Sequence, residues 1–250
     1  KEVFLLGQNV NNYGKNFSDG RDKFNFTKLL QAISEIEKLE RIRFTSPHPL
    51  HMDNEFIAEF ASNPKICKQI HVPLQAGSTK VLKDMKRGYT KEWFIDRCQR
   101  IKSLVPEVRI STDIIVGFPG ETNEEFKDTI DVINTVKFDQ IFNFKYSPRP
   151  ETEALHMSNQ VEDDIASARL EEVIALHKNH QVELMQENVG KTMNVFFEEL
   201  KPNGEIMGFS DNYCQIFVEA SEELLGCTVP IKIIHANRTS LKGEVVAKEN

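Results

Sequence analysis

The chain has 250 residues, of which 40% are hydrophobic, and its formal net charge is -7 at pH 7. This length suffices for one large domain or for a barrel with a small appended domain. No apolar run approaches the roughly 20 residues of a membrane span, and no signal peptide opens the chain, so we expect a cytoplasmic protein that makes no membrane contact. The negative charge gives no general electrostatic reason to bind nucleic acid.

The four cysteines are widely spaced and form no Cys-x-x-Cys pair or other ligand cluster; they are Cys67, Cys98, Cys214 and Cys227. We expect each to be a small buried or half-buried residue and not a metal ligand. The chain begins without methionine, already inside an apolar run at Val3. From this we expect it to be part of a longer protein.

The first part of the chain alternates strand-like and helix-like segments. We predict strands over 3–6, 41–46, 67–74, 108–116 and 138–146. Helices are predicted between these strands: over 25–39, from Asp53 to Phe60, from Thr90 to about 104, and from Thr122 to about 136. A further helical stretch follows Ser78 and ends at about Met85. Repeated strand–helix units imply right-handed crossovers and a parallel sheet, whose ligands gather at the carboxyl ends of the strands.

The pattern changes after a long helix predicted over 162–188. Five short β runs follow, separated by turn residues, over 193–197, 206–209, 215–218, 229–235 and 242–246. This spacing predicts a small all-β barrel. We therefore expect two domains, 1–189 and 190–250.

The segment STDIIVGFPGET (111–122) runs from a strand directly into a glycine-rich turn. Gly117 and Gly120 are too close together for a phosphate-binding P-loop or a dinucleotide fingerprint. Strand alternation separates Asp113 from the apolar residues Ile114 and Val116. A carboxylate within an apolar strand is costly unless it is hydrogen-bonded, which favours a position facing a site; a structural hydrogen bond to a neighbouring strand is the alternative.

Five segments of the chain resemble the radical-SAM methylthiotransferases in order and separation, and the terminal β module resembles a TRAM domain. The segments are EVFLLGQNVNNYG (2–14), RIRFTSPHP (41–49), HVPLQAGSTKVLKDMKRGYT (71–90), STDIIVGFPGET (111–122) and FKYSPRPETEA (144–154). LLGQNVN and TSPHP are most similar to the branch that acts on isopentenylated adenosine in tRNA. The branches that modify ribosomal protein S12 or threonylcarbamoyladenosine rank lower.

The resemblance implies an α/β fold, a partial (β/α) radical-SAM barrel of TIM-like type with a C-terminal TRAM barrel. It implies S-adenosylmethionine and two 4Fe-4S clusters in the full-length protein, and methylthiolation of carbon 2 of an adenosine beside the anticodon. The implied partners are the tRNA anticodon stem-loop and an electron donor such as flavodoxin or ferredoxin. The four cysteines match neither set of cluster ligands in the family, so we expect no metal ligand and no catalytic residue here, and an inactive chain when it is alone.

The resemblance also implies a set of cofactor-binding residues: Gln8, Asn9, Gln75, Ser78, Asp113, Gly117, Ser147 and Arg149. Ordinary turn chemistry is the alternative for Gln8 and Asn9, and loop solvation for Gln75 and Ser78. Arg149 is expected to meet the cofactor carboxylate or a tRNA phosphate, with an ion pair to Glu151 or Glu153 as the alternative. Glu151 stands where the family pattern has glycine.

For the β module we expect a local RNA-binding patch of Lys232, Arg238 and Lys242. His177 and His180, on the long predicted helix, are expected on a solvated face. Two further functions stay open at this point: an RNA-binding module without chemistry and a non-radical (β/α)-barrel enzyme.

Overall fold

The computed structural model describes residues 1–15, 24–219 and 222–246. Contacts divide the chain into two compact units, Lys1–His177 and Lys178–Asn250. The division lies within helix α6 (Asp163–Gln186), before the boundary expected at Gly190. The end of this helix belongs to the second unit because Met185 is part of that unit's hydrophobic core.

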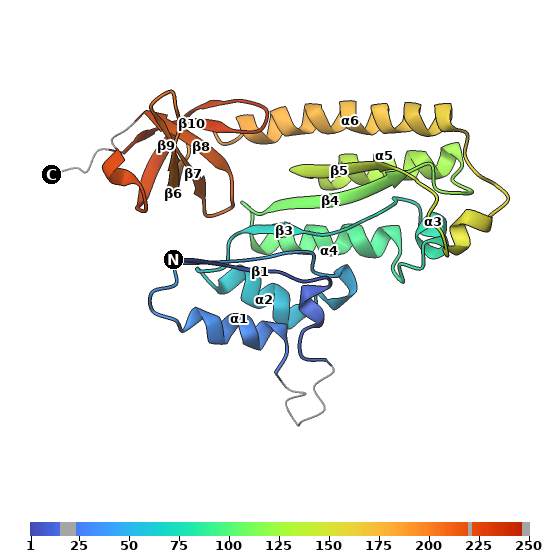
Figure 1. The fold of residues 1–250 in the computed structure, drawn as a ribbon, viewed down its shortest axis with the longest axis horizontal. Helices are drawn as coiled ribbons and strands as arrows, with labels where there is room; N and C mark the ends of the chain where they lie inside the picture. The colour runs from blue at the N-terminus through green and yellow to red at the C-terminus, as the bar shows by residue number, and fades with distance from the viewer. Residues whose placement is uncertain (16–23, 220–221, 247–250) are drawn as a thin grey trace. The chain divides into compact units, whose positions relative to one another are not determined.

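The first unit is built on five strands that follow one another in space in chain order (Figure 1). They are β1 (Glu2–Leu5), β2 (Arg41–Phe44), β3 (Gln69–His71), β4 (Arg109–Val116) and β5 (Gln140–Lys145). The strand pairs are all parallel, and a parallel bridge between Ile42 and Ile66 joins β1–β2 to the β3–β4–β5 sheet. The predicted parallel, partial barrel is confirmed.

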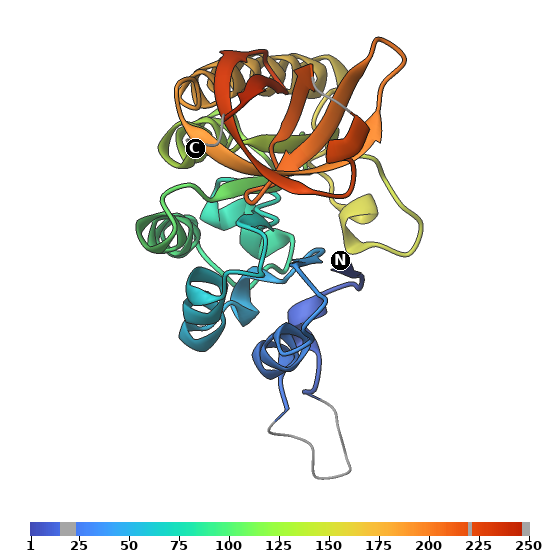
Figure 2. The same cartoon turned by 90° about the vertical axis from the view of Figure 1, so that its left-hand side faces the viewer.

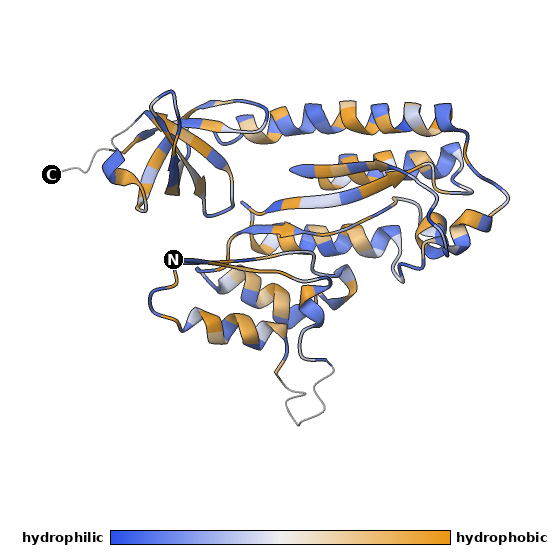
Figure 3. Ribbon diagram, viewed as in Figure 1, coloured by the Kyte–Doolittle hydropathy of each residue, from blue (hydrophilic) through white to orange (hydrophobic). Residues whose placement is uncertain are grey.

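Five helices cover one face of these strands: α1 (Phe26–Ser34), α2 (Asn54–Ser62), α3 (Thr79–Asp84), α4 (Lys91–Leu104) and α5 (Asn123–Val136). Apolar and polar residues are mixed on each helix (Figure 3), and the apolar ones share one core with the strands. The predicted N-caps are present: Asp53, Thr90 and Thr122 accept hydrogen bonds from the backbone of their helices. The last of these forms a full capping box with Glu125.

Two predicted elements extend well beyond the observed ones. The helix predicted over 25–39 ends at Ser34, where the Lys65 ammonium donates to the carbonyls of Ser34 and Ile36 and so replaces helical hydrogen bonds. The strand predicted over 67–74 is only three residues long. Pro73 has no backbone N–H to donate, and Gln75 has a left-handed backbone with φ +75°, so regular pairing stops there.

The second unit contains a closed barrel with the strand order β10-β8-β7-β6-β9 (Figure 2). The strands are β6 (Thr192–Leu200), β7 (Glu205–Ser210), β8 (Gln215–Glu219), β9 (Thr228–Ala236) and β10 (Leu241–Val245). Val195, Phe197 and Ile216 are among the fully buried residues that fill it. The predicted small all-β barrel is confirmed. No helix in the described part of the chain is both long and apolar enough to cross a membrane.

Short 3-10 turns complete the description: η1 (Val10–Asn12), η2 (Pro49–His51), η3 (Glu153–His156) and η4 (Glu222–Leu224).

Candidate functional site

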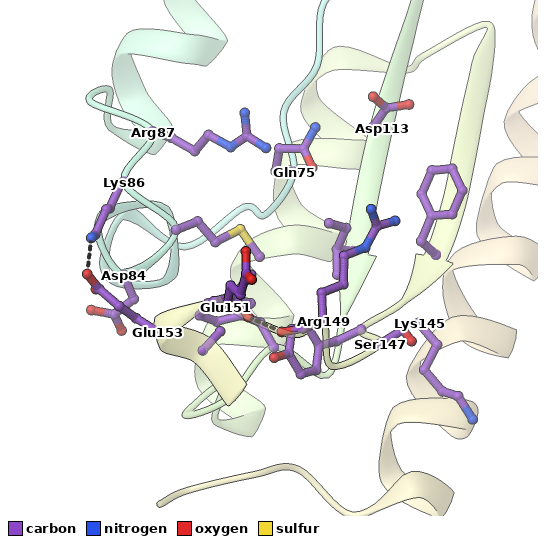
Figure 4. A pocket seen from close by; sticks show the side chains of 17 residues that line it. Gln75, Asp84, Lys86, Arg87, Asp113, Lys145, Ser147, Arg149, Glu151 and Glu153 are labelled. Atoms are coloured by element: carbon purple, nitrogen blue, oxygen red, sulfur yellow. Dashed lines mark hydrogen bonds and ion pairs between the residues drawn. The ribbon is translucent and has the colours of Figure 1, made fainter. Parts of the chain in front are cut away.

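A cavity of about 760 Å³ lies where β3, β4 and β5 end (Figure 4). Its walls come from the exit of β3, the turn after α3, the inner face of β4, and the segment from β5 to η3. The residues that line it include Gln75, Arg87, Asp113, Ile115, Phe118, Phe144, Tyr146, Ser147 and Arg149. Because all three strands are parallel, their carboxyl ends bring residues that are far apart in sequence to one edge of the sheet.

Half of the predicted cofactor-binding set lines this cavity: Gln75, Asp113, Ser147 and Arg149. Gln8 and Asn9 are exposed at the end of β1 and are not among the lining residues. Ser78 and Gly117 are buried but do not line the cavity either.

The glycines near the cavity make close contacts with the chain itself. A Cβ on Gly117, which has φ +73°, would lie 2.6 Å from the Cβ of Ala166 on α6. A Cβ on Gly77 would overlap the Cα of Thr129 on α5. The family resemblance placed Gly117 among the cofactor-binding residues. The structure gives both glycines a packing reason, because each turn lies tightly against a helix.

Gln75 is held on β4 by its backbone, which leaves its side chain in the cavity (Figure 4). Its N–H donates to the carbonyl of Asp113, and its carbonyl accepts from the N–H of Ile115, both at 2.8 Å. The left-handed backbone of Gln75 is unusual for a residue other than glycine, and such conformations cluster at functional sites.

Asp113 faces the cavity, while Ile114 and Val116 on the opposite face of β4 are fully buried. Its carboxylate lies 3.3 Å from Nε2 of His71 on β3. Asp113 thus combines both roles that the sequence left open, the position facing a site and the hydrogen bond to a neighbouring strand.

Arg149 extends into the cavity from the loop after β5 (Figure 4). The alternative partner Glu153 is paired with Lys86 at 2.6 Å. Within the described residues, Arg149 makes no ion pair with Glu151 or Glu153. Glu151 itself has φ +66°, so this glutamate adopts the backbone conformation for which glycine was expected.

The sequence reasoning missed Arg87, which lines the cavity and whose guanidinium points toward the Gln75 side chain (Figure 4). It stands in a tight turn after α3, between Lys86 with φ +59° and Gly88 with φ +76°. The turn is fixed by a hydrogen bond from the Arg87 N–H to the carbonyl of Leu82 at 2.9 Å. The Arg87 Nε is buried and has no hydrogen-bond partner among the described residues. The only signal in the sequence was Lys-Arg-Gly directly after a helix.

The remaining wall of the cavity is aromatic and apolar. Phe118 and Tyr146 meet edge to face, with ring centroids 5.4 Å apart. Phe144 is 51% exposed. Together with Ile115, these rings border a set of charged and polar groups. Four are basic and four acidic, and one is an amide: Lys86, Arg87, Lys145, Arg149, Asp84, Asp113, Glu151, Glu153 and Gln75. Such a cavity suits a ligand that carries a flat ring, hydroxyl groups and charged groups.

The cysteines do not supply a metal site. Cys67, Cys98 and Cys214 are buried at separate positions and Cys227 is exposed. Burial raises the pKa of the Cys98 thiol to about 12, which disfavours the thiolate that a metal requires. No group of three or more His, Cys, Asp or Glu residues that could hold a metal ion is found in the described ranges. The four cysteines therefore do not fit the ligand set of an iron–sulfur cluster.

The expectation of a solvated face for His177 and His180 is wrong, because both side chains are buried. Nε2 of His177 accepts a hydrogen bond from the N–H of Ile141 at 3.2 Å, so this part of α6 packs on β5. A polar histidine can be buried there because the backbone of the edge strand offers it a donor.

The three expected RNA-binding residues differ in their availability. Lys232 is exposed on β9. The Arg238 guanidinium donates to Oε1 of Gln181 at 2.7 Å. Lys242 forms an ion pair with Glu205 at 2.8 Å, and the hydrogen bond to this carboxylate raises the pKa of Lys242. Two of the three cations are therefore already engaged by the protein.

A parallel half-barrel with a polar cavity at its strand ends, followed by a closed β barrel, corresponds to two known domains. The chain belongs to the radical SAM superfamily, whose sequence profile matches residues 1–133, and the profile of the TRAM domain matches residues 186–246.

Several curated relatives that it matches are named tRNA-2-methylthio-N(6)-dimethylallyladenosine synthase. That of Aliarcobacter butzleri (strain RM4018) is 63% identical over 246 residues, which is 98% of this chain and 56% of the relative. That of Sulfurimonas denitrificans is 57% identical over 98% of this chain and 57% of the relative. The chain thus spans somewhat more than half of the length of these relatives. Among solved structures, the radical SAM enzyme coproporphyrinogen III oxidase (HemN) from Escherichia coli aligns with a TM-score of 0.48 and 13% identity, covering 70% of this chain and 46% of that one.

Proposed function

We propose that the whole protein is a tRNA methylthiotransferase, which adds a methylthio group to carbon 2 of N6-isopentenyladenosine beside the anticodon. The identity of 63% to a relative with this activity in its name supports the proposal, as does the combination of a radical SAM domain with a TRAM domain. Its substrate is the anticodon stem-loop of tRNA, and its electron donor is a flavodoxin or ferredoxin. The cytoplasm, where tRNA is modified, is its place of action.

We propose that the cavity at the ends of β3, β4 and β5 binds S-adenosylmethionine. The aromatic pair of Phe118 and Tyr146 offers a wall for the adenine ring. Asp113 and Gln75 supply acceptors and donors for hydroxyl groups. An iron–sulfur cluster would supply the electron for cleavage of the cofactor. The described residues contain no group of His, Cys, Asp or Glu side chains that could hold one, so we assign no step to the cysteines of this chain.

The assignment of this cavity to S-adenosylmethionine rests mainly on the buried Nε of Arg87. A buried guanidinium nitrogen without a partner is costly, and the cost is removed when an anionic group binds beside it. The carboxylate of the methionine half of the cofactor matches the planar donor geometry of arginine. Arg149 lines the same cavity but is exposed, so it suits a phosphate of the tRNA backbone.

Calorimetric titration of this chain with two nucleosides tests the cavity. S-adenosylhomocysteine carries the amino-acid carboxylate, whereas 5'-methylthioadenosine lacks it. We expect Arg87→Gln to weaken binding of S-adenosylhomocysteine about tenfold or more, the usual size for a charge-assisted hydrogen bond, and to leave 5'-methylthioadenosine unaffected. Equal losses for both nucleosides would show that Arg87 only maintains the fold.

The activity needs the full-length protein with its clusters reconstituted anaerobically. We expect mass spectrometry to show a methylthio group on tRNA that carries N6-isopentenyladenosine. The matched substrate with unmodified adenosine at the same position is expected to give no product. Methylthiolation of threonylcarbamoyladenosine tRNA or of ribosomal protein S12, without that of isopentenylated tRNA, would assign the protein to another branch of the family.

A further inference from the structure

A chain of hydrogen bonds runs along the inner face of the half-barrel, beneath the cavity. His71 on β3 lies directly beside Ser111 on β4, since the two residues are partners in the parallel ladder. Its Nδ1 is 3.0 Å from the hydroxyl oxygen of Ser111, and its Nε2 is 3.3 Å from Oδ2 of Asp113. Gln69, on the same face of β3, donates to the Ser111 hydroxyl at 3.4 Å.

The ring of His71 is held in place from a third side. Phe142 on β5, the ladder partner of Asp113, meets it edge to face with ring centroids 5.8 Å apart. The imidazole therefore contacts a hydroxyl and a carboxylate on β4 and an aromatic ring on β5. The His71 side chain is 16% exposed and that of Asp113 is 27% exposed, so the polar contacts lie largely out of water.

The chemistry of these partners decides which nitrogen carries the proton. The Asp113 carboxylate only accepts, so Nε2 must carry the hydrogen that it receives. In the neutral ring Nδ1 is then an acceptor, and the Ser111 hydroxyl donates to it. Each of the two bonds thus fixes the same tautomer and the same ring orientation.

We propose that His71 is a positioning residue for Asp113, and that the pair serves to bind the ribose hydroxyls of the nucleoside in the cavity. The hydrogen bond from Nε2–H of His71 to Oδ2 of Asp113 fixes the rotation of the carboxylate. Oδ1 is then available to accept a hydrogen bond from a hydroxyl of the ribose. This inference rests on the proposed nucleoside site, and it assigns His71 and Ser111 a part in that site although neither lines the cavity.

Two substitutions of His71 separate positioning from packing. Glutamine at position 71 places an amide N–H near the position of Nε2, whereas leucine fills similar space without any donor. We expect His71→Leu to weaken binding of S-adenosylhomocysteine to this chain about fivefold to tenfold, and His71→Gln to retain most of the affinity. In an Asp113→Asn background, His71→Leu should have little further effect, because the carboxylate that it orients is gone.

A second ligand and a spectroscopic measurement complete the test. With the 2'-deoxy analogue of S-adenosylhomocysteine, the loss caused by His71→Leu should shrink. Nitrogen-15 chemical shifts of the histidine ring should report the Nε2–H tautomer in the unaltered chain and a mixture of tautomers in Ser111→Ala.

The outcomes distinguish this inference from the proposed function. If the unaltered chain binds S-adenosylhomocysteine and His71→Leu binds it equally well, the positioning role is wrong while the nucleoside site stands. Equal losses with the ribose and 2'-deoxy nucleosides, or an Nδ1–H tautomer in the unaltered chain, also overturn it. Failure of the unaltered chain to bind either nucleoside overturns the proposed site and this inference together.

Discussion

The Arg169 guanidinium lies 2.7 Å from the Glu121 carboxylate, in an ion pair whose side chains are 7% and 0% exposed. The same carboxylate oxygen accepts the N–H of Gly117 at 2.7 Å, and Arg169 also donates to the carbonyl of Glu121 and to Asn123. Helix α6 is thereby joined to the turn after β4. Phe118, which belongs to this turn, lines the cavity, so the ion pair helps to set the position of an aromatic wall.

Removal of Arg169 is expected to destabilise the first unit strongly. Arg169→Met leaves a buried carboxylate without its cation, which costs about 3–5 kcal/mol in comparable pairs. Chemical denaturation measures this loss, with Arg100→Met on the exposed side of α4 as the control. The double variant Arg169→Met, Glu121→Leu should recover much of the stability, since it removes the unpaired charge.

The stability of Arg169→Met should also depend on pH. Burial, the largest cause, already raises the pKa of Glu121, and Arg169 counteracts this. Without the arginine the pKa rises further above its unfolded value, so the folded state binds a proton more readily than the unfolded state does. The variant should therefore gain stability as the pH falls from about 8 toward about 5. A stability that is equally low across this pH range would contradict the raised pKa of Glu121 in the folded variant.

Gly77→Ala tests the close packing of the turn after β3. The new Cβ would overlap the Cα of Thr129 and lie 2.6 Å from the carbonyl oxygen of Asp128, and neither backbone atom can rotate away. We expect a loss of about 1–3 kcal/mol in the free energy of unfolding. Gly7→Ala is the matched control, because its nearest contact would be 3.7 Å. Equal stabilities of the two variants would show that the turn can shift.

Glycine at position 151 should suit the observed backbone better than glutamate does. Glu151 has φ +66°, a conformation that costs a side chain with a Cβ about 1–2 kcal/mol. Glu151→Ala keeps this strain and removes the carboxylate, so it separates the two effects. We expect Glu151→Gly to be more stable than Glu151→Ala by about 1 kcal/mol in thermal denaturation. A less stable glycine variant would contradict the strain at this position.

His48 and His51 should make the protein less stable in mild acid. Burial is the main cause that lowers the pKa of both histidines, and the rings lie 5.3 Å apart. The unfolded state then binds more protons than the folded state does. The contribution of the two histidines to the free energy of unfolding is therefore present above pH about 6.5 and is lost as the pH falls through their lowered folded-state pKa values. Replacement of both by glutamine should flatten the curve of unfolding free energy against pH. His156→Gln, at an exposed position, is the control that should leave the curve unchanged.

The β barrel should bind RNA through Lys232 more than through Lys242. An ion pair with Glu205 already neutralises Lys242, whereas Lys232 is exposed. Each phosphate contact adds about 0.7–0.9 to the slope of log affinity against log salt concentration. We expect Lys232→Gln to reduce this slope for an anticodon stem-loop by about one contact and Lys242→Gln to reduce it less. A larger effect of Lys242→Gln would mean that RNA displaces Glu205.

Local sequence determined most of the elements and their order. Caps at Asp53, Thr90 and Thr122 are short-range features, since each side chain accepts from a backbone N–H three residues away. Hydrophobic periodicity and strand alternation likewise predicted the parallel sheet, the terminal β barrel, and the side of β4 on which Asp113 lies. These predictions required only the periods of helix and strand, whereas the partial barrel was implied by the family resemblance.

The tertiary structure alone decided which of these residues meet. Arg87 enters the cavity because a left-handed turn aims it there, and no periodicity in the sequence encodes that conformation. The partner of Asp113 is His71, 42 positions away, brought beside it by the register of β3 and β4. Gly117 lies tightly against Ala166 of α6, a residue far from it in the sequence. Contacts between distant segments depend on how helices and strands pack, which local sequence patterns do not specify.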